Sequence, residues 1–151
     1  MHILPLAYYL NSFLDNLYVA DRANNRIRKI TNLVDSAPTV TPAYYPTVSP
    51  SNNAIIYTIA GTGEWGYSGD NSDATNATMT IPQGVAVDAI GNVYFADLFN
   101  NRVRKITVST GIISTYVGTG SGAYSGDGDV ATSAAVNSPS GLCMDSAGIN
   151  T

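Results

Sequence analysis

The stretch Gly84-Val-Ala-Val-Asp-Ala-Ile-Gly-Asn-Val-Tyr-Phe-Ala-Asp97 decides the fold of this chain, together with its continuation Leu98-Phe-Asn-Asn-Arg-Val-Arg-Lys-Ile-Thr107. Short apolar runs alternate here with turn residues, which is typical of antiparallel strands. We expect a first strand over residues 85–88, and the others are expected over residues 93–96, 102–107 and 112–117. The stretch therefore predicts a sheet of four antiparallel strands.

This sheet unit recurs along the chain. Two segments within residues 60–88 return within residues 117–145, both at an offset of 57 residues. Residues 17–31 match residues 93–107 at an offset of 76 residues, so the first copy contains 19 additional residues. Because the expected strands are apolar on both faces, each sheet should be covered on both sides, as in a β-propeller. A lone β-sandwich is the structural alternative.

The additional residues lie in a proline-rich insertion at residues 32–54. It contains prolines at every fourth position, namely Pro38, Pro42, Pro46 and Pro50. Proline cannot donate to a sheet ladder and fixes its own backbone angle, so we expect an extended, polyproline-like loop. We interpret the insertion as a spacer, and a recognition peptide for a proline-binding partner is the alternative.

The repeated pattern Pro-x-Gly-Val-Ala-Val-Asp-x-x-Gly-Asn-Val-Tyr-x-Ala-Asp-x-x-Asn-Asn-Arg-Val-Arg-Lys-Ile resembles the NHL repeat, a β-propeller blade unit. The linking motifs Ala-Gly-Thr-Gly and Tyr-Ser-Gly-Asp resemble the long-repeat type of that family. The resemblance implies an all-β fold of propeller blades, each with four antiparallel strands. It also implies a platform that binds proteins, RNA or small ligands, although some relatives of this kind are lyases.

The repeat divides the chain into about two to two and a half blades. The first blade covers residues 1–84, with a degenerate first strand for which residues 3–14 are candidates. A complete repeat covers residues 85–141, and the start of a third covers residues 142–151. We therefore expect an incomplete propeller that is a fragment of a larger protein. Its partners would then include the remaining blades or further copies of itself.

Composition restricts the possible partners. The formal net charge is −4 and the chain has a pI of about 4.5, whereas nucleic-acid binding requires a basic surface. The single cysteine, Cys143, cannot form an internal disulfide. The apolar N-terminus is shorter than the roughly 20 residues that a membrane-spanning helix needs. We expect no nucleic-acid partner and no membrane span.

Six of the seven basic residues lie in two copies of one strand: Arg26, Arg28, Lys29, Arg102, Arg104 and Lys105. A basic stripe for RNA is one interpretation, as in some NHL proteins. We favour a structural role, in which Asp21 pairs with Arg26 and Asp97 pairs with Arg102 across the turn between the second and third strands.

The loops are the candidate binding residues. The turn between the second and third strands and the link between blades should lie at the same end of the propeller. The aromatic, apolar and acidic side chains expected on this loop face are Trp65, Tyr67, Asp70, Leu98, Phe99, Tyr124 and Asp127. Exposed aromatic residues beside carboxylates are typical of protein-binding surfaces. The alternative is structural, with the tyrosines filling gaps between blades and the aspartates capping turns.

Two cofactor signatures are incomplete. The segment Gly61-Thr-Gly-Glu-Trp-Gly66 matches the dinucleotide-binding fingerprint, but the residues after it do not begin a helix that could meet a pyrophosphate. A calcium site could use Asp127 with Asp129, or Asp70 with Asp73, although the spacing departs from the known calcium loop. We expect no cofactor, with calcium as the alternative.

Catalysis has few candidate residues in this sequence. His2 is the only histidine and lies near the N-terminus, so we expect neither a Ser-His-Asp triad nor a multi-histidine metal site in this chain. We expect a non-catalytic scaffold that binds a protein or glycan-like partner through the loop face. A fragment of a propeller lyase, with its catalytic residues in other blades, is the alternative. The sequon Asn76-Ala-Thr78 slightly favours an extracellular or cell-surface location.

Overall fold

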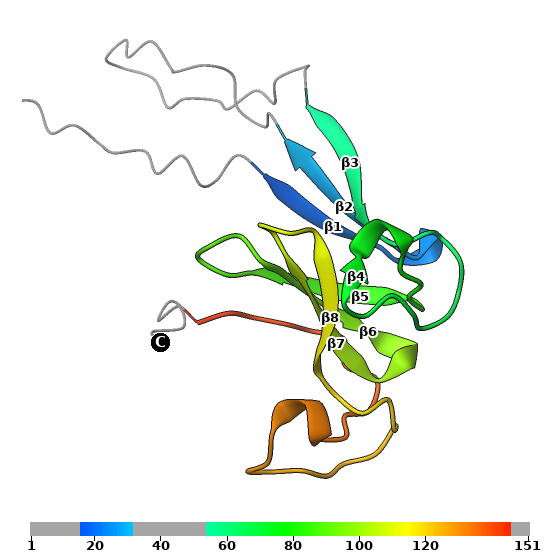
Figure 1. Ribbon diagram of the computed structural model, residues 1–151, viewed down its shortest axis with the longest axis vertical. Helices are drawn as coiled ribbons and strands as arrows, with labels where there is room; N and C mark the ends of the chain where they lie inside the picture. The colour runs from blue at the N-terminus through cyan, green and yellow to red at the C-terminus, as the bar shows by residue number, and fades with distance from the viewer. Residues whose placement is uncertain (1–15, 32–53, 146–151) are drawn as a thin grey trace, which may run out of the picture.

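The computed structural model describes residues 16–31 and 54–145, which form two antiparallel sheets (Figure 1). The first sheet has the order β1-β2-β3 and consists of β1 (Leu17–Asp21), β2 (Arg26–Thr31) and β3 (Ile55–Ala60). The second has the order β4-β8-β7-β6-β5 and consists of β4 (Ser72–Asp73), β5 (Pro82–Val87), β6 (Val93–Asp97), β7 (Arg102–Thr107) and β8 (Ile112–Val117).

The second sheet contains the four strands that the sequence predicts, and it also contains one that the sequence does not. The short strand β4 comes from the link between the sheets and pairs with β8, with Ser72 opposite Ile113 and Asp73 opposite Ile112. Its two residues carry no apolar alternation, so no local pattern marks them as a strand. The strand forms because the link folds back along the edge of β8.

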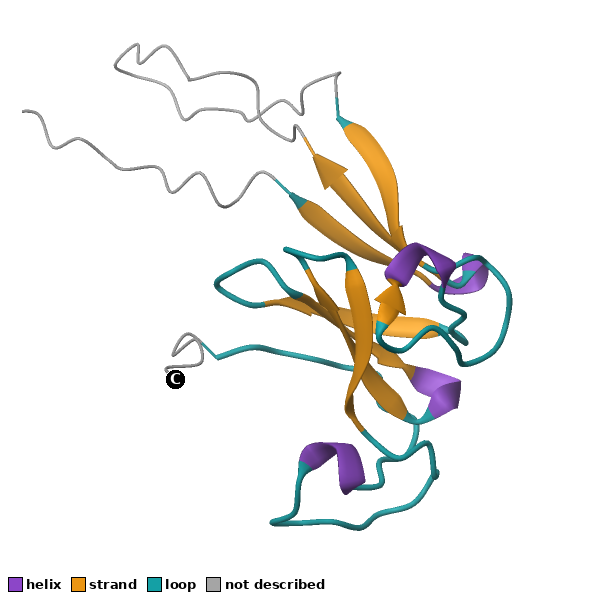
Figure 2. Ribbon diagram, viewed as in Figure 1, coloured by secondary structure: helices purple, strands orange, loops and turns teal. Residues whose placement is uncertain are grey.

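The helical elements of the described residues are four single 3-10 turns, and no α-helix is present there (Figure 2). They are η1 (Arg22–Asn24), η2 (Ala74–Asn76), η3 (Leu98–Asn100) and η4 (Ala131–Ser133). No helix in this part of the chain is long and apolar enough to cross a membrane. The candidate first strand at residues 3–14, most of the proline-rich insertion and residues 146–151 lie outside the described residues.

The segment between β3 and β5 (residues 61–81) is called the first link, and its copy after β8 (residues 118–138) is called the second link. Each link is held to a sheet by the second asparagine of an Asn-Asn pair. Asn25 follows η1 with a positive φ of 47°, a conformation that asparagine tolerates better than most residues. Its side chain donates to the Gly63 carbonyl and accepts from the Ile81 amide. Asn101 makes the corresponding bonds to Gly120 and Ser138. The turns and the links therefore lie at the same end of the sheets, as expected.

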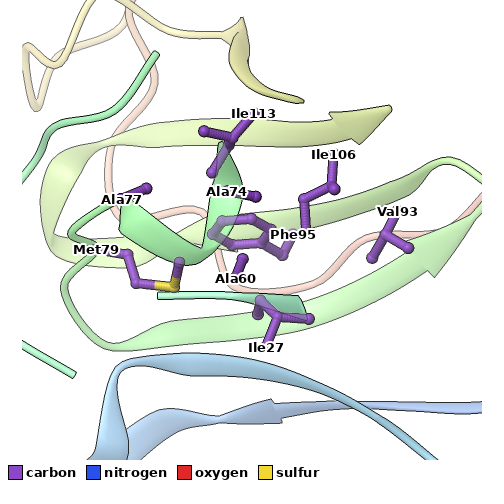
Figure 3. Close-up of a cluster of buried hydrophobic side chains, with 9 residues drawn as sticks. All are labelled: Ile27, Ala60, Ala74, Ala77, Met79, Val93, Phe95, Ile106 and Ile113. Atoms are coloured by element: carbon purple, nitrogen blue, oxygen red, sulfur yellow. The ribbon is translucent and has the colours of Figure 1, made fainter. Parts of the chain in front are cut away.

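The hydrophobic core lies between the two sheets and is closed by the first link (Figure 3). The first sheet contributes Ile27 and Ala60, and Phe95 of β6 occupies the centre of the cluster. The remaining members, from the link and the second sheet, are Ala74, Ala77, Met79, Val93, Ile106 and Ile113. The core thus joins elements that are far apart in sequence.

The two sheets are stacked in the same orientation. Phe95 faces the first sheet, and its counterpart in the repeat, Val19, lies on the opposite face of the first sheet from Ile27. In a sandwich, equivalent inner faces of the two sheets would meet. Here the face of the first sheet that carries Ile27 packs against the face of the second sheet that carries Phe95, and these two faces are not equivalent in the repeat. This is the arrangement of propeller blades.

Candidate functional site

A buried arginine fixes the first link to the second sheet. Arg104 of β7 is fully buried, and its Nη1 atom lies 3.4 Å from Oδ2 of Asp97 at the end of β6. Its Nη2 atom lies 2.7 Å from Oδ1 of Asp70 and donates to the Ser68 carbonyl at 2.9 Å. One guanidinium thus binds a strand end and a link whose residues are more than 30 positions away in sequence.

This pairing corrects the expected one between Asp97 and Arg102. Arg102 lies directly opposite Asp97 in the ladder, but its guanidinium donates to the carbonyls of Asn100 at 2.9 Å and Thr119 at 2.6 Å. It fills the space above Gly120, where a Cβ atom would collide with it. The long Arg104 side chain reaches Asp97 diagonally instead.

The first sheet shows the same exchange of partners. Asp21 pairs with Arg28 at 3.3 Å and not with Arg26 as expected. Arg26 donates to the carbonyls of Asn24 at 3.0 Å and Thr62 at 2.7 Å. The link carbonyls compete for the first arginine of each Arg-x-Arg pair, and they leave the second arginine for the aspartate.

Tyr67 lies over both arginines of the second sheet. Its ring centroid is 3.8 Å from the Arg102 Cζ atom and 4.8 Å from the Arg104 Cζ atom. Its hydroxyl donates to Asp70 Oδ2 at 2.7 Å and lies 2.9 Å from the Thr115 hydroxyl. Stacked cation–π contacts of this kind contribute about 0.5–2 kcal/mol. Tyr67 and Asp70 therefore contribute to the contact between blades, and a role in binding a partner stays a prediction.

The two carboxylates that contact Arg104 have pKa values shifted in opposite directions. Desolvation by complete burial raises the pKa of Asp97 above its ordinary value, against the hydrogen bonds from Thr80, Asn100 and the guanidinium. Partial burial also acts to raise the pKa of Asp70, but hydrogen bonds from Thr115 and Tyr67 and the charge of Arg104 outweigh it and lower that pKa. Asp70 therefore stays ionised over the neutral range.

The lowered pKa of Asp70 predicts a loss of stability in acid. A carboxyl whose pKa is lower when folded stabilises the fold above its unfolded value of 3.8, and this contribution is lost as the pH falls through the folded value. At neutral pH we expect Asp70→Asn to lower the free energy of unfolding by about 1 kcal/mol, after allowance for solvent screening. The difference should shrink below pH 3.8.

Urea unfolding of both proteins, followed by circular dichroism across this pH range, measures the difference. Asp129→Asn is the matched control, because Asp129 is exposed in the second link. A difference between the wild type and Asp70→Asn that stays constant down to the lowest pH would contradict the ion pair.

The second link repeats the tyrosine–aspartate hydrogen bond of the first link, but without the arginines that contact Tyr67. Tyr124 is 82% exposed and donates to Asp127, as Tyr67 does to Asp70. The bond to the Asp127 carboxylate raises the pKa of Tyr124. In the described residues no arginine stacks on this ring. The second link lies beyond the second sheet, on the side away from the first sheet (Figure 1).

Besides Tyr67, which is 41% exposed, two aromatic side chains lie exposed beside the first link. Trp65 is 67% exposed and Phe99 is 56% exposed, while Leu98 is half-buried. Hydrogen bonds hold the segments that carry them, since the Asn100 side-chain amide donates to the Gly66 carbonyl at 2.8 Å and the Phe99 backbone amide donates to the Thr80 carbonyl at 3.3 Å. The structure thus holds these aromatic positions at one end of the sheets.

Thr80 and Ser68 also belong to this region, although they are not among the residues that the sequence predicts. The Thr80 amide donates to Asp97, and its hydroxyl accepts from the Gly66 amide. Ser68 accepts from Arg104 through its carbonyl. The signal that could have found Ser68 is its place in the repeated Tyr-Ser-Gly-Asp motif. Thr80 has no such signal, because Asn137 occupies its place in the second copy.

The remaining candidate residues have structural partners or lie apart. Asp73 accepts from the amide and hydroxyl of Thr75 and so caps η2. The fingerprint segment that begins at Gly61 runs into a loop, and the next helical turn starts only at Ala74. Within the described ranges no three His, Cys, Asp or Glu side chains cluster as metal ligands do. Asn76 of the sequon is exposed, and His2 lies outside the described residues.

Comparison with known proteins supports the assignment of the repeat to the NHL type. A family model described as the Teneurin NHL domain matches residues 5–125. The chain is 28% identical to Teneurin-1 of Gallus gallus and 32% identical to Teneurin-3 of Mus musculus, in each case over 119 residues. These matches cover 74% of this chain and 4% of each relative. The chain therefore spans a small part of the length of its curated relatives.

Two solved structures from Bacteroides thetaiotaomicron share the fold. One is a structural genomics protein of unknown function, with a TM-score of 0.62 and 22% identity, matching 86% of this chain and 27% of its own. The other is an auxiliary nutrient binding protein, with a TM-score of 0.61 and 21% identity, matching 88% of this chain and 30% of its own. Together with the stacked sheets, these findings confirm the all-β propeller fold class, and by the family match this chain belongs to the Teneurin NHL domain family.

Proposed function

We propose that this chain is a non-catalytic propeller module that binds a protein partner through an aromatic loop face, defined here by Trp65, Leu98 and Phe99. The observation that supports it is the exposure of two large aromatic side chains at one end of the blades. Tryptophan and other aromatic residues are enriched in protein interfaces, where they provide a large contact area for few rotatable bonds.

The backbone beneath the aromatic loop face is fixed before any partner binds. Thr80 bonds to Gly66 through its hydroxyl and to the Phe99 amide through its carbonyl. Asn100 bonds to both Gly66 and Asp97, each at 2.8 Å. Because the backbone is already fixed, binding pays a smaller entropic cost for ordering the loops. Even a small aromatic surface can therefore support specific recognition.

The basic residues of β7 offer little to a phosphate backbone. Arg104 is fully buried, and Arg102 is bound to main-chain carbonyls. Lys105 lies over the rings of Tyr94 and Tyr116, at 5.5 Å and 6.0 Å. With a net charge of −4, the chain is better suited to a protein partner than to RNA.

Affinity capture with the full chain tests the aromatic loop face. We compare the wild type with the double variant Trp65→Ala/Phe99→Ala, and with Ile90→Ala as the matched control. Ile90 is 75% exposed in the turn at the far end of β6 from Phe99. We expect the double variant to lose about 2 kcal/mol or more of binding energy, roughly a thirtyfold loss of affinity for the purified partner.

The control should retain full affinity for the partner. Equal capture of the same partner by the wild type and the double variant would place binding elsewhere. A glycan-like ligand in place of a protein would appear as capture that survives protease treatment of the bound fraction.

The proposal also predicts a chain without a resident metal. Three of the four candidate calcium ligands are engaged in other bonds: Asp70 with Arg104, Asp73 with Thr75 and Asp127 with Tyr124. Elemental analysis of the purified full chain should find zinc and calcium far below one ion per chain. A stoichiometric ion that survives dialysis would contradict the metal-free module and favour the calcium alternative.

A further inference from the structure

The first link contains an acceptor sequence for a covalent modification that the proposed function does not use. Asn76-Ala77-Thr78 is the only Asn-x-Ser/Thr triplet in the chain. Such a triplet is the acceptor for N-linked glycosylation when its middle residue is not proline. The corresponding residues of the second link are Ser133-Ala134-Ala135, so the repeat itself requires neither the asparagine nor the threonine.

The second link shows that the local fold forms without these two residues. The turn η4 (Ala131–Ser133) is a single 3-10 turn like η2 (Ala74–Asn76). The residue after each turn is an alanine in extended conformation, with φ of −78° and ψ of 151° at Ala77 and φ of −77° and ψ of 151° at Ala134. The conformation of the turn therefore does not explain why residue 76 is an asparagine.

Asn76 lies at the exposed end of η2. Ala74 and Ala77 are 1% and 0% exposed and belong to the hydrophobic core, whereas Asn76 between them is exposed. Asn25, by contrast, is 2% exposed, and its side-chain amide donates to the Gly63 carbonyl. The two alanines thus anchor the turn and leave Asn76 accessible from solvent.

The exposure of Asn76 is set by two sheets that the structure describes. The Gly61 amide, directly after β3, donates to the Ala74 carbonyl at 2.9 Å. The Ala74 amide donates to the carbonyl of Gly111, directly before β8, also at 2.9 Å. Figure 1 shows the turn beside the end of β3. Both neighbouring sheets are therefore in place around Asn76, and they leave it open.

Thr78 has a structural partner, which decides how the site must be tested. Its hydroxyl lies 2.9 Å from the Ser68 hydroxyl, and its backbone amide donates to the same Ser68 oxygen at 3.1 Å. Removal of the Thr78 hydroxyl would change both the acceptor sequence and a contact within the link. Serine at this position keeps both a hydroxyl and the acceptor sequence.

We infer that Asn76 is a site of N-linked glycosylation, from which the glycan extends into solvent. The oligosaccharide is supplied by a polyprenyl pyrophosphate donor in the secretory pathway. A bond forms between the Asn76 Nδ2 atom and the anomeric carbon of the first sugar, and the bond from that carbon to the pyrophosphate oxygen breaks. The lipid pyrophosphate leaves, and the amide proton passes to a base of the transferase. The inference is independent of the proposed function, since it uses no residue of the aromatic loop face.

Secretion of the full chain from eukaryotic cells, behind a cleavable secretion signal, tests the site. The wild type should migrate more slowly in electrophoresis than the same protein after treatment with peptide-N-glycosidase. That enzyme converts a glycosylated asparagine to aspartate, so treatment in heavy-oxygen water followed by mass spectrometry should find the label at residue 76. Asn76→Ser, which introduces the residue of the second link, should lose the shift completely.

Thr78→Ser is the matched control and should keep the glycan on Asn76. Circular dichroism and size-exclusion chromatography show whether each protein is folded. A wild type without the glycan in both the secreted and the retained fractions would overturn the inference. A glycan found only on unfolded chains would overturn it as well, because the folded turn would then not accommodate the modification.

Discussion

Replacing Arg104 with methionine is expected to lower the free energy of unfolding by about 3–5 kcal/mol. The substitution keeps much of the side-chain volume but leaves the Asp97 carboxylate fully buried without its cation. It also removes the donor to the Ser68 carbonyl and the ion pair to Asp70, which hold the first link on the second sheet. Urea unfolding followed by circular dichroism measures the loss.

The repeat supplies the control for this substitution. Arg28→Met changes the corresponding arginine of the first sheet, which pairs with Asp21 but remains partly exposed to solvent. Exposed ion pairs contribute less than about 1 kcal/mol, so this variant should be nearly as stable as the wild type. The comparison is made at a protein concentration at which the chain is monomeric. Equal losses in the two variants would show that burial does not determine the strength of the pair.

Replacing Phe95 with alanine is expected to cost about 3–5 kcal/mol of unfolding free energy. The ring is fully buried at the centre of the cluster that joins the two sheets, beside Ile27 and Met79 (Figure 3). Its removal leaves a cavity that the rigid sheets on either side cannot close. We expect the transition to become broader as well, because the sheets lose the contact that makes them unfold together.

Phe99→Ala is the matched control, four residues further along the chain. Its ring is more than half exposed on the aromatic loop face, so the free energy of unfolding should change by no more than about 0.5 kcal/mol. A loss as large as that of Phe95→Ala would mean that the loop face is part of the core. It would then be a poor candidate for a binding surface.

Much of the fold could be predicted from the sequence, because its signals are local and repeated. The alternation in residues 84–107 marks strands, and the offset of 57 residues shows that the unit is copied. The strands β6 to β8 occur where this pattern places them, whereas β5 begins at Pro82, three residues before the expected start at Val85. The short strand β4 could not be predicted, because Ser72 and Asp73 are ordered by the edge of β8 and not by their own sequence.

The pairing of charges could be predicted only in part. The sequence places aspartates and arginines at adjacent strand ends, and direct opposition in the ladder suggests Asp97 with Arg102. The observed pair with Arg104 depends on the Thr119 carbonyl, which draws Arg102 away, and on a link 36 residues distant that covers Arg104. The local sequence pattern around Asp97 contains no information on these distant carbonyls, so it cannot predict which arginine pairs with the aspartate.

By itself, the sequence determined the repeated blade, its strands and the residues that each copy contains. The tertiary structure decided which copy of a motif contacts a neighbouring sheet and which does not. Tyr67 and Tyr124 stand in the same Tyr-Ser-Gly-Asp segment, yet the first lies against two arginines and the second is 82% exposed. The reason is physical: identical segments have identical local preferences, but their contacts depend on the neighbouring sheet, which is present beside one copy and absent beside the other within the described residues.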